Sequence, residues 1–454
     1  MAVGARSAVW APAPEIAGIV VLDAHDEAYV EERAPTWNAW MVAAERARRA
    51  GVGCTLISAC PSLEMLQWGD LLTPSRSAER EGWPIVEVID RRVEDPRSGL
   101  ISHRLAGMLR DVLGGRSVVG GSADRSVVGG SADHGTQVVC VLNTRGWAAL
   151  LACAACGELA RCERCLAAVE VQGAPAGSES RTAHGTVPGT VSRAGGQGSG
   201  AEGGDQAAGA GPRQLTCRRC GTRRPVVCAA CSSQRLKVLR SGVSRVGEQL
   251  EALTGTAVPV VTGEHDRQAS SRAMRCSRVL VGTEAVLNRM VAEGRKVQAV
   301  VFLDFDRELL VPRVRASERA MMLLAKAARL AWARGQGGRI LVQTRVPDHE
   351  VIAAAMRADP GRMVVAEARV RRELRFPPAW AVARISGPGA ADFVAETQAG
   401  VSISQGKVAV VEAQGPGPDG WLLRARDHET LCNVLAHVPR LAARVRIEVD
   451  PIRL

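Results

Sequence analysis

Cysteine is the residue type whose spacing in this chain points most directly to chemistry. Eight of the thirteen cysteines form four C-x2-C pairs: Cys153 and Cys156, Cys162 and Cys165, Cys217 and Cys220, and Cys228 and Cys231. A C-x2-C turn lets both thiolates bind one metal ion at about 2.3 Å, and two such turns complete the tetrahedral ligand set that zinc accepts. Four pairs therefore predict two zinc ions per chain.

Other uses of paired cysteines fit less well. Disulfides are rare in a reducing cytosol, a redox-active pair would not occur four times, and iron–sulfur sites use other spacings. Eight cysteine ligands leave no open coordination position for water, so the predicted zinc ions are structural and not catalytic.

Two groups of acidic residues are further candidates for chemistry. Apolar residues 19–22 run into Asp23, His25, Asp26 and Glu27, which is where ATP-driven motors carry the carboxylates that bind magnesium and activate water. A motor also needs a phosphate-binding loop, but residues 1–22 contain no glycine-rich loop ending in Lys and Ser or Thr. The second group, Asp304 and Asp306, ends an apolar run, and a loop-capping role is its simpler interpretation.

Composition limits the class of protein and its partners. The 454 residues are 46% hydrophobic and 23% charged, as expected for a globular chain of two to four domains. The formal net charge of +11 favours an acidic partner, with nucleic acid preferred over membrane, although a strong bias toward Arg also fits a GC-rich genome. Aromatic residues make up only 3%, which argues against a base-stacking platform. Without an apolar stretch long enough to span a membrane or a secretory signal, we expect a cytoplasmic protein.

The elements that would position these residues alternate between strands and helices. Residues 16–113 show the pattern of one parallel α/β sheet, with strands in GIVVLD, GCTLISA and PIVEVID. Strands QVVCVLN, VPVVTG, RVLVGT, AVVFLDFD and RILVQT predict a second parallel sheet, and residues 346–454 predict a small α+β domain.

Two low-complexity segments interrupt this pattern. The sequence RSVVGGSAD occurs at 116–124 and again at 125–133, and two copies are too few for a solenoid, so residues 114–136 are predicted to be a linker. Residues 173–212 are rich in Gly, Ala, Ser and Thr and are predicted to be a disordered insertion. The cysteines outside the pairs are predicted to be small core residues: Cys54, Cys60, Cys140, Cys276 and Cys432.

The chain resembles the PriA family of replication-restart proteins, also called primosomal protein N′. The resemblance follows the family's order from about residue 18 onward and is carried by LNTRGWAALLACAACGELARCERCLAAV, LTCRRCGTRRPVVCAAC, VLVGTEAVL, VVFLDFD, RASERAMMLL, ILVQTRVPDHEVI, RRELRFPPAWAVARI and IEVDPIRL. It implies an α/β fold with remnants of two RecA-like helicase lobes: 1–113 for the first lobe, 137–345 for the second with a zinc-binding module at 150–235, and a C-terminal α+β domain at 346–454. It also implies nested zinc sites, one held by Cys153, Cys156, Cys228 and Cys231 and the other by Cys162, Cys165, Cys217 and Cys220.

The family's motor motifs are degraded at the matching positions. Ala24 stands where the family has the carboxylate that polarises water, and Ser58, Ala59 and Cys60 stand for its Ser-Ala-Thr motif. LNRMV at 287–291 replaces a Lys-Gly-His-Asp motif. KAARLAWARG at 326–335 replaces the family's motif rich in Gly and Arg. Either Arg329 or Arg334 could take the place of one arginine finger of that motif. Because each such loss costs on the order of a thousandfold in rate, we expect no helicase activity.

The favoured hypothesis is a DNA-binding, non-motor component of the replication-restart primosome that recognises stalled or abandoned forks and helps to reload the replicative helicase. The predicted phosphate contacts are Arg218, Arg219, Arg223 and Arg224, for which a solvated loop is an equal alternative. Forked or single-stranded DNA would be the ligand, and the resemblance implies primosome proteins and single-stranded DNA-binding protein as partners at the nucleoid. The alternative is the C-terminal part of an ATP-dependent 3′-to-5′ helicase whose ATP-binding motifs lie upstream. A zinc-ribbon transcription or RNA-processing factor would explain the cysteines but not the ordered resemblance.

Overall fold

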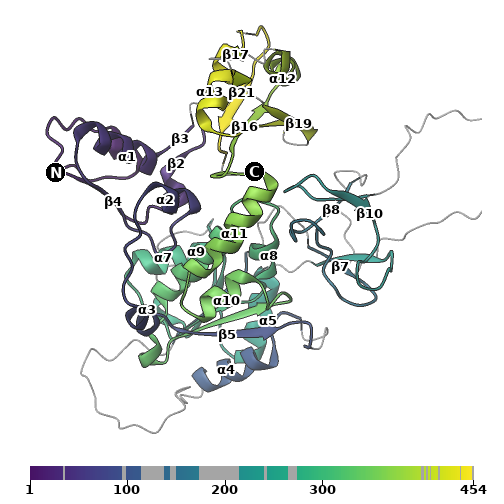
Figure 1. Cartoon of the computed structure of the whole chain (residues 1–454). Helices are drawn as coiled ribbons and strands as arrows, with labels where there is room; N and C mark the ends of the chain where they lie inside the picture. The colour runs from purple at the N-terminus through teal and green to yellow at the C-terminus, as the bar shows by residue number, and fades with distance from the viewer. Residues whose placement is uncertain are drawn as a thin grey trace, which may run out of the picture. The chain divides into compact units, whose positions relative to one another are not determined.

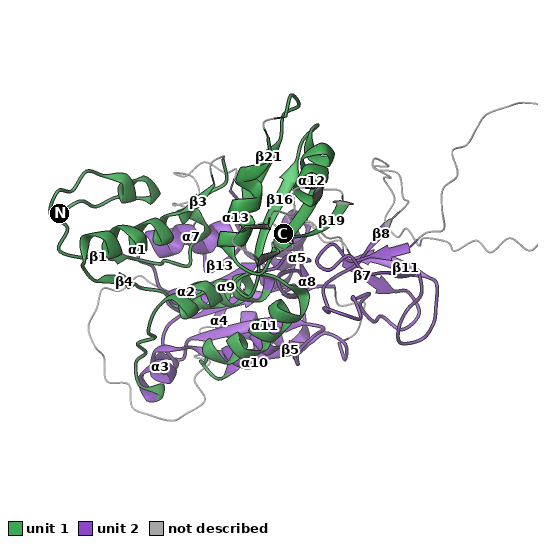
Figure 2. Cartoon of the chain, turned by 45° about the horizontal axis from the view of Figure 1, so that its top comes forward, with its two compact units in different colours: residues 1–76, 317–325, 357–454 green, residues 77–316, 326–356 purple. Residues whose placement is uncertain are grey.

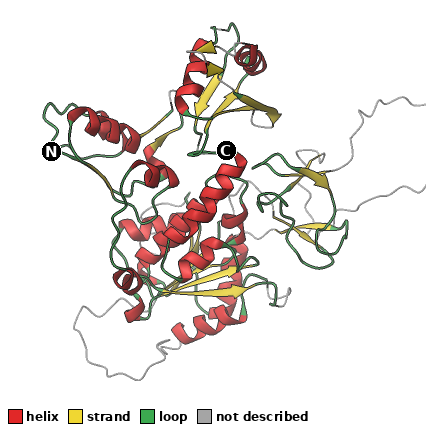
Figure 3. Cartoon of the chain, viewed as in Figure 1, coloured by secondary structure: helices red, strands yellow, loops and turns green. Residues whose placement is uncertain are grey.

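The structure is a computed structural model of the whole chain. It describes all residues except 34–35, 95–98, 114–136, 144–149, 173–213, 240–242, 264–273, 400–402, 405–406, 409–410, 418–419, 440 and 452–454. The predicted linker at 114–136 and the predicted disordered insertion at 173–212 therefore lie outside the described residues. Helices and strands alternate along much of the rest (Figure 3).

The described residues divide into two compact units (Figure 2). Unit 1 comprises residues 1–76, 317–325 and 357–454, and unit 2 comprises residues 77–316 and 326–356. Each unit is thus assembled from segments that are far apart in the sequence, and each is described by itself below.

Unit 2 is built on a six-stranded sheet in which every neighbouring pair of strands is parallel. The predicted second parallel sheet is therefore confirmed. The strand order is β12-β13-β6-β14-β15-β5, and the strands are β5 (Ile85–Asp90), β6 (Val138–Val141), β12 (Val260–Val261), β13 (Val279–Gly282), β14 (Ala299–Phe302) and β15 (Arg339–Thr344).

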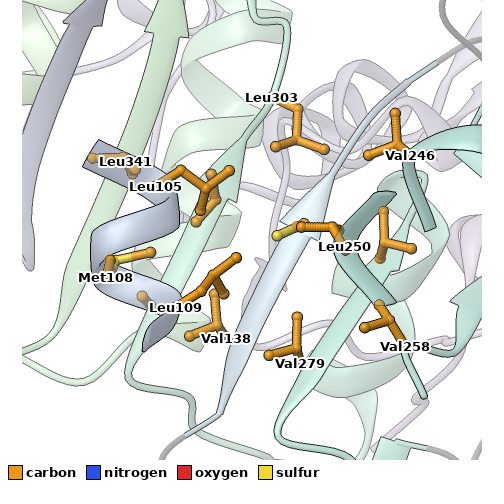
Figure 4. Packing of buried hydrophobic residues seen from close by; sticks show 14 of the residues in the cluster. Leu105, Met108, Leu109, Val138, Val246, Leu250, Val258, Val279, Leu303 and Leu341 are labelled. Carbon is orange, nitrogen blue, oxygen red and sulfur yellow. The ribbon is translucent and has the colours of Figure 1, made fainter. Parts of the chain in front are cut away.

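The sheet is buried on both faces, which explains why its strands have continuous apolar sequences. On one face, Val138 and Val279 pack against Leu109 of α4 (His103–Leu113) and Leu250 of α5 (Val243–Thr254) (Figure 4). Since side chains alternate along a strand, the intervening residues point to the opposite face. Other helices of unit 2 are α7 (Glu284–Ala292), α8 (Asp306–Leu310) and α10 (Glu350–Met356).

Strand β5 differs from the prediction. PIVEVID was expected in one sheet with the strands of residues 16–56, but β5 instead pairs with β15 over six residues, from Ile85 opposite Arg339 to Asp90 opposite Thr344. That expectation is wrong because an apolar strand is specified by its pattern, whereas its partner is chosen by long-range packing that the pattern does not contain.

The N-terminal part of unit 1 contains a two-stranded parallel sheet of β1 (Ile19–Val21) and β4 (Cys54–Leu56). Helix α1 (Ala39–Ala50) covers one face through Trp40 and Ala43, and α2 (Leu63–Trp68) adds Met65 to the same core. Short elements of this part are η1 (Arg6–Trp10), η2 (Glu27–Tyr29), β2 (Val30–Glu31) and β3 (Trp37–Asn38), whereas α3 (Arg76–Gly82) belongs to unit 2 except for Arg76.

The C-terminal part of unit 1, residues 357–454, combines helices with an antiparallel sheet, whereas residues 346–356 of the predicted α+β domain belong to unit 2. An antiparallel sheet of order β19-β20-β16-β21 packs against α12 (Ala390–Ala399) and α13 (His428–His437) around Phe393 and Leu431. Its strands are β16 (Ala381–Ser386), β19 (Glu412–Gly417), β20 (Gly420–Ala425) and β21 (Arg446–Val449), and β17 (Ile403–Ser404) pairs with β18 (Lys407–Val408).

A buried ion cluster ties together the segments of unit 1. Arg371 of α11 (Gly361–Leu374) is completely buried and pairs with Glu367 at 2.9 Å, with Glu318 at 2.8 Å and with Glu64 at 3.4 Å. Glu318 lies in α9 (Ala316–Leu330) and also accepts the backbone N–H of Leu63 at 2.9 Å. One guanidinium therefore links α2, α9 and α11. None of the described helices combines the length and apolar character needed to cross a bilayer.

Candidate metal centres and nucleic-acid interface

Each of the four C-x2-C pairs forms the same backbone turn. In every turn the N–H of the first cysteine donates to the carbonyl five residues later, and the N–H of the residue after the second cysteine donates back to the carbonyl of the first. That last residue has a positive φ in all four turns: Gly157, Leu166, Gly221 and Ser232. Because both thiolates of such a turn point inward from a fixed backbone, the chain supplies four matching two-ligand units.

Two pairs of antiparallel strands bring these turns together. Strand β7 (Leu150–Cys153) pairs with β11 (Leu236–Leu239), which sets the first turn beside the fourth. Strand β8 (Glu170–Gln172) pairs with β9 (Gln214–Thr216), which sets the second turn beside the third, and β9 also pairs with β10 (Arg223–Pro225). Figure 1 shows β7, β8 and β10 gathered close together.

The result is two clusters of four cysteines with all Sγ atoms of a cluster within 4.8 Å of one another. The outer cluster is Cys153, Cys156, Cys228 and Cys231, and the inner cluster is Cys162, Cys165, Cys217 and Cys220. This grouping is the nested one that the resemblance implies.

The sulfur geometry fits a tetrahedral metal ion. Four sulfurs about 2.3 Å from zinc would lie about 3.8 Å from one another. The Sγ atoms are 3.5 Å apart for Cys153 and Cys231, 3.7 Å for Cys156 and Cys228, and 3.5 Å for both Cys162–Cys220 and Cys165–Cys217. Burial raises the pKa of the Cys153 thiol, but hydrogen bonds from the backbone N–H groups of Cys156 and Ala155, together with those of the Cys231 and Cys156 thiols, lower this pKa to about 6. Either cluster is therefore able to hold a metal ion that prefers four thiolates.

The cysteine module is fixed to the rest of unit 2 through backbone carbonyls. The N–H of Ala168 donates to Leu310 of α8 at 2.7 Å, next to the inner cluster. On the outer side, Nη1 of Arg345 donates to the carbonyl of Gly157 at 3.1 Å. Each cluster thus has a contact of this kind beside it, and Nη2 of Arg219 adds another on the inner side by donating to the carbonyl of Val314.

The four predicted DNA-contacting arginines have different surroundings. Arg219 is buried and donates to the carbonyl of Val314 at 3.4 Å, and Arg224 is largely buried and donates to the carbonyl of Arg161 at 3.3 Å. Arg218 is partly exposed and pairs with Glu170 at 2.6 Å, and Arg223 is exposed. Two of the four guanidinium groups therefore serve the packing of the module, a role that the sequence spacing did not reveal.

Ala24 and Ser58, which the resemblance aligns with motor motifs, follow the carboxyl ends of β1 and β4. Oγ of Ser58 lies 2.9 Å from Nδ1 of His25 and accepts the N–H of Cys60 at 3.1 Å. Ala24 is buried, and its N–H donates to the carbonyl of Ile57. The contact between Ser58 and His25 was not predicted, because 33 residues separate them and only the pairing of β1 with β4 brings them together.

The proposed substitutes for the arginine finger lie in unit 2. Arg329 and Arg334 are exposed, and the neighbouring carbonyl of Leu330 accepts the N–H of Val297 just before β14. Both arginines thus lie near the amino end of β14, away from the carboxyl ends of the parallel strands.

Asp304 and Asp306 have structural partners, in agreement with a capping role. The carboxylate of Asp306 accepts the hydroxyl of Thr344 and the N–H of Arg345, while Asp304 pairs with Arg307 at 3.0 Å. Burial, followed by repulsion from Asp304, raises the pKa of Asp306 to about 6. This aspartate joins the ends of β14 and β15.

The unpaired cysteines are only partly as predicted. Cys60 and Cys140 are buried, and burial raises both thiol pKa values to about 12. Cys54 is half-buried, and Cys276 and Cys432 are exposed, so the prediction of core positions is wrong for the last two.

The fold and the site together define an α/β protein whose parallel-sheet unit carries an inserted module of two four-cysteine clusters. No family model matches the chain. Individual proteins do: replication restart protein PriA of Bacillus subtilis is 26% identical over 407 residues, covering 85% of this chain and 43% of that protein. The probable replication restart protein PriA of Mycobacterium leprae is 26% identical over 490 aligned positions, covering 100% of this chain and 65% of that protein.

A third relative, replication restart protein PriA of Rickettsia felis, is 23% identical over 397 residues, covering 83% of this chain and 52% of that protein. The chain is therefore similar to PriA over most of its length, although divergent, which confirms the resemblance carried by its sequence motifs. It spans between 43% and 65% of the length of these three relatives.

Proposed function

We propose that this chain is a DNA-binding and protein-docking component of replication restart, without motor activity and with one zinc ion in each cysteine cluster. The observation that carries the proposal is the similarity to replication restart proteins over 83% to 100% of the chain, which includes both clusters. Fork recognition and reloading of the replicative helicase are the activities we propose for it, with forked DNA and primosome proteins as partners.

The donor set supports zinc as the metal. Four thiolates in tetrahedral spacing suit a soft, redox-inert ion, and the eight cysteines leave no position open for a reacting water. Bound zinc would cross-link the turns that the strand pairs β7–β11 and β8–β9 already bring together. The purified chain should therefore contain two zinc ions, measured by elemental analysis.

The surroundings of Ala24 support the lack of motor activity. Position 24 matches the family's water-polarising carboxylate but is an alanine with a buried methyl group, so it carries no acid. The hydroxyl of Ser58, in the motif that couples hydrolysis to movement in the family, is engaged by His25 and by the N–H of Cys60. We propose that the residues before β5 are a remnant of a first helicase lobe and that the sheet of unit 2 is the second.

The exposed arginines of the cysteine module support nucleic acid as the ligand. Residues 150–172 and 214–239 contain eight Arg and Lys against three Glu, a difference of +5, which two zinc ions each bound by four thiolates would reduce to +1. Of the predicted contacts, Arg218 and Arg223 present guanidinium groups at the surface, so the proposal rests on these two. Each phosphate that they neutralise would release counterions and make binding weaker in salt.

Equilibrium binding of the zinc-loaded chain to a model fork, in competition with plain duplex at physiological salt, tests the proposal. A preference for the fork is expected. Binding that is absent, or equal for fork and duplex, would contradict the proposed fork recognition.

Charge reversal tests the surface. Arg218→Glu with Arg223→Glu should weaken binding and lower the slope of log K against log salt by about 0.9 for each duplex phosphate that is no longer neutralised. The matched control is Arg48→Glu with Arg49→Glu, an equal change of charge on the exposed face of α1. An equal loss of binding in both variants would mean that only net charge matters, and an unchanged slope in the first would remove the module from the interface.

A further inference from the structure

The two cysteine clusters differ in how far their sulfurs are covered. In the outer cluster, Cys156 and Cys231 are exposed, whereas Cys153 and Cys228 are buried. In the inner cluster, three cysteines are buried and Cys220 is half-buried. Each exposed residue is the second cysteine of its turn, so one side of the outer cluster faces solvent.

The residues between the cysteines explain this difference. Both outer turns have the sequence Cys-Ala-Ala-Cys, and of these alanines Ala155, Ala229 and Ala230 are exposed. The inner turns have Cys-Glu-Arg-Cys and Cys-Arg-Arg-Cys, where Arg219 is buried against Val314 and Arg218 pairs with Glu170. Short methyl side chains thus flank the exposed outer cysteines, whereas longer side chains flank the inner cysteines, three of which are buried.

We propose that the outer cluster is an oxidation site at which Cys156 and Cys231 react with a peroxide, so that this cluster loses its zinc while the inner cluster keeps its own. This inference rests on the proposed zinc occupancy. Exposed thiolates are the sulfur species that oxidants attack, and burial protects the others.

The step balances without a further reactant. One thiolate attacks an oxygen of the peroxide, which breaks the O–O bond, releases hydroxide and leaves a sulfenic acid; the second thiolate, within 4.8 Å of the first, then attacks that sulfur and displaces its oxygen as hydroxide. Two thiolates lose one electron each and form one S–S bond, and the peroxide leaves as two hydroxides. Zinc then keeps only Cys153 and Cys228 and dissociates.

The structure also indicates what the loss of the outer zinc would change. Gly157 directly follows Cys156, and its carbonyl accepts from Arg345, whose own N–H is bound by Asp306. Opening the outer turn would loosen this attachment. The attachments beside the inner cluster, through Ala168 and Leu310 and through Arg219 and Val314, would remain, so the module would stay anchored on that side.

The test uses the full chain with two zinc ions bound, carrying Cys276→Ser and Cys432→Ser to remove the exposed thiols outside the clusters. Hydrogen peroxide is added, zinc release is followed with a metal-binding dye, and remaining thiols are alkylated and assigned by mass spectrometry. One of the two zinc ions should leave first, with Cys156 and Cys231 protected from alkylation as a disulfide. Simultaneous release of both ions, or early oxidation of Cys220, would overturn the proposal. A chain that never holds two zinc ions would instead contradict the proposed metal occupancy.

Two exposed substitutions test the role of access. Ala155→Leu adds neutral bulk beside Cys156 and should slow the first release, whereas Arg164→Ala, at the equivalent position of an inner turn, should speed the second release. Hydrogen exchange of the amide at Arg345 should rise with the first release and not with the second. If Ala155→Leu releases zinc at the original rate, coverage of the sulfur does not control the reaction.

Discussion

Arg371 provides the sharpest test of how unit 1 is held together. Replacing it with Met keeps most of its length but removes a cation that Glu64, Glu318 and Glu367 share, and the side chains of these glutamates are only 9%, 5% and 4% exposed. Removing one partner of a buried ion pair costs about 3–5 kcal/mol, because the remaining charge stays buried without compensation. We therefore expect Arg371→Met to destabilise unit 1 by about that amount.

Arg369→Met is the matched control. Arg369 lies on the same helix, but its side chain is 78% exposed and its partner Glu373 is 66% exposed at 3.6 Å. An exposed pair of this kind contributes about 0.3–0.5 kcal/mol. The comparison thus holds the residue change and the helix constant and varies burial.

The assay is urea-dependent hydrogen exchange of amides in α2 and α11, since it reports the opening of one part of a chain that has two units. Adding Glu318→Gln to Arg371→Met should recover part of the loss, because the amide oxygen of Gln can still accept the N–H of Leu63. If the loss of stability in Arg371→Met differs by less than about 1 kcal/mol from the loss in Arg369→Met, the cluster does not hold these helices together.

Three further predictions concern other parts of the chain. The pKa of Asp306 is about 6 in the folded chain against an ordinary 3.8, so folding favours its protonated form. Unit 2 should therefore lose up to about 3 kcal/mol of stability as the pH rises from 3.8 to about 6. Urea unfolding of Asp306→Asn at several pH values should not show this loss. The hydrogen bond with Asp450 raises the pKa of His428 above 6.5. The protonated histidine should therefore stabilise the fold below pH 6.5, and this stabilisation should be lost as the pH rises through the folded pKa. In the Asp450→Asn variant, an NMR titration should find the His428 pKa closer to 6.5. A Cβ at Gly282 would overlap the carbonyl of Val261, so Gly282→Ala should destabilise unit 2 by about 1–3 kcal/mol. A Cβ at Gly107 in α4 meets no atom within 4 Å, so Gly107→Ala should stabilise unit 2 by about 0.5–1 kcal/mol in the same unfolding assay.

The turns of the cysteine module illustrate how much local sequence can reveal. The C-x2-C spacing identifies four two-ligand units, since the turn is formed within six residues. The left-handed residue after each second cysteine is visible only where it is glycine, at Gly157 and Gly221. Leu166 and Ser232 adopt the same conformation without a sequence signal, because the hydrogen bonds of the turn override their local preference.

The arginines of the module show where local sequence is not sufficient. Arg218 and Arg219 are adjacent and chemically identical, yet one faces Glu170 at the surface and the other is buried against Val314. The sequence therefore indicates a basic module but not which guanidinium groups reach a ligand. That difference arises from packing against α8 and the residues that follow it, which are about 95 residues away in the chain.

The sequence by itself determined the features that depend on short-range chemistry: the apolar strands of the parallel sheet, the four two-cysteine turns and the resemblance to PriA. Tertiary structure alone decided which strands pair, that β5 joins β15, that Ser58 meets His25, and that one guanidinium at Arg371 serves three carboxylates. The physical reason is the range of the forces involved. Periodicity and turn geometry act within a few residues, whereas burial and charge pairing depend on segments that only the folded chain brings together.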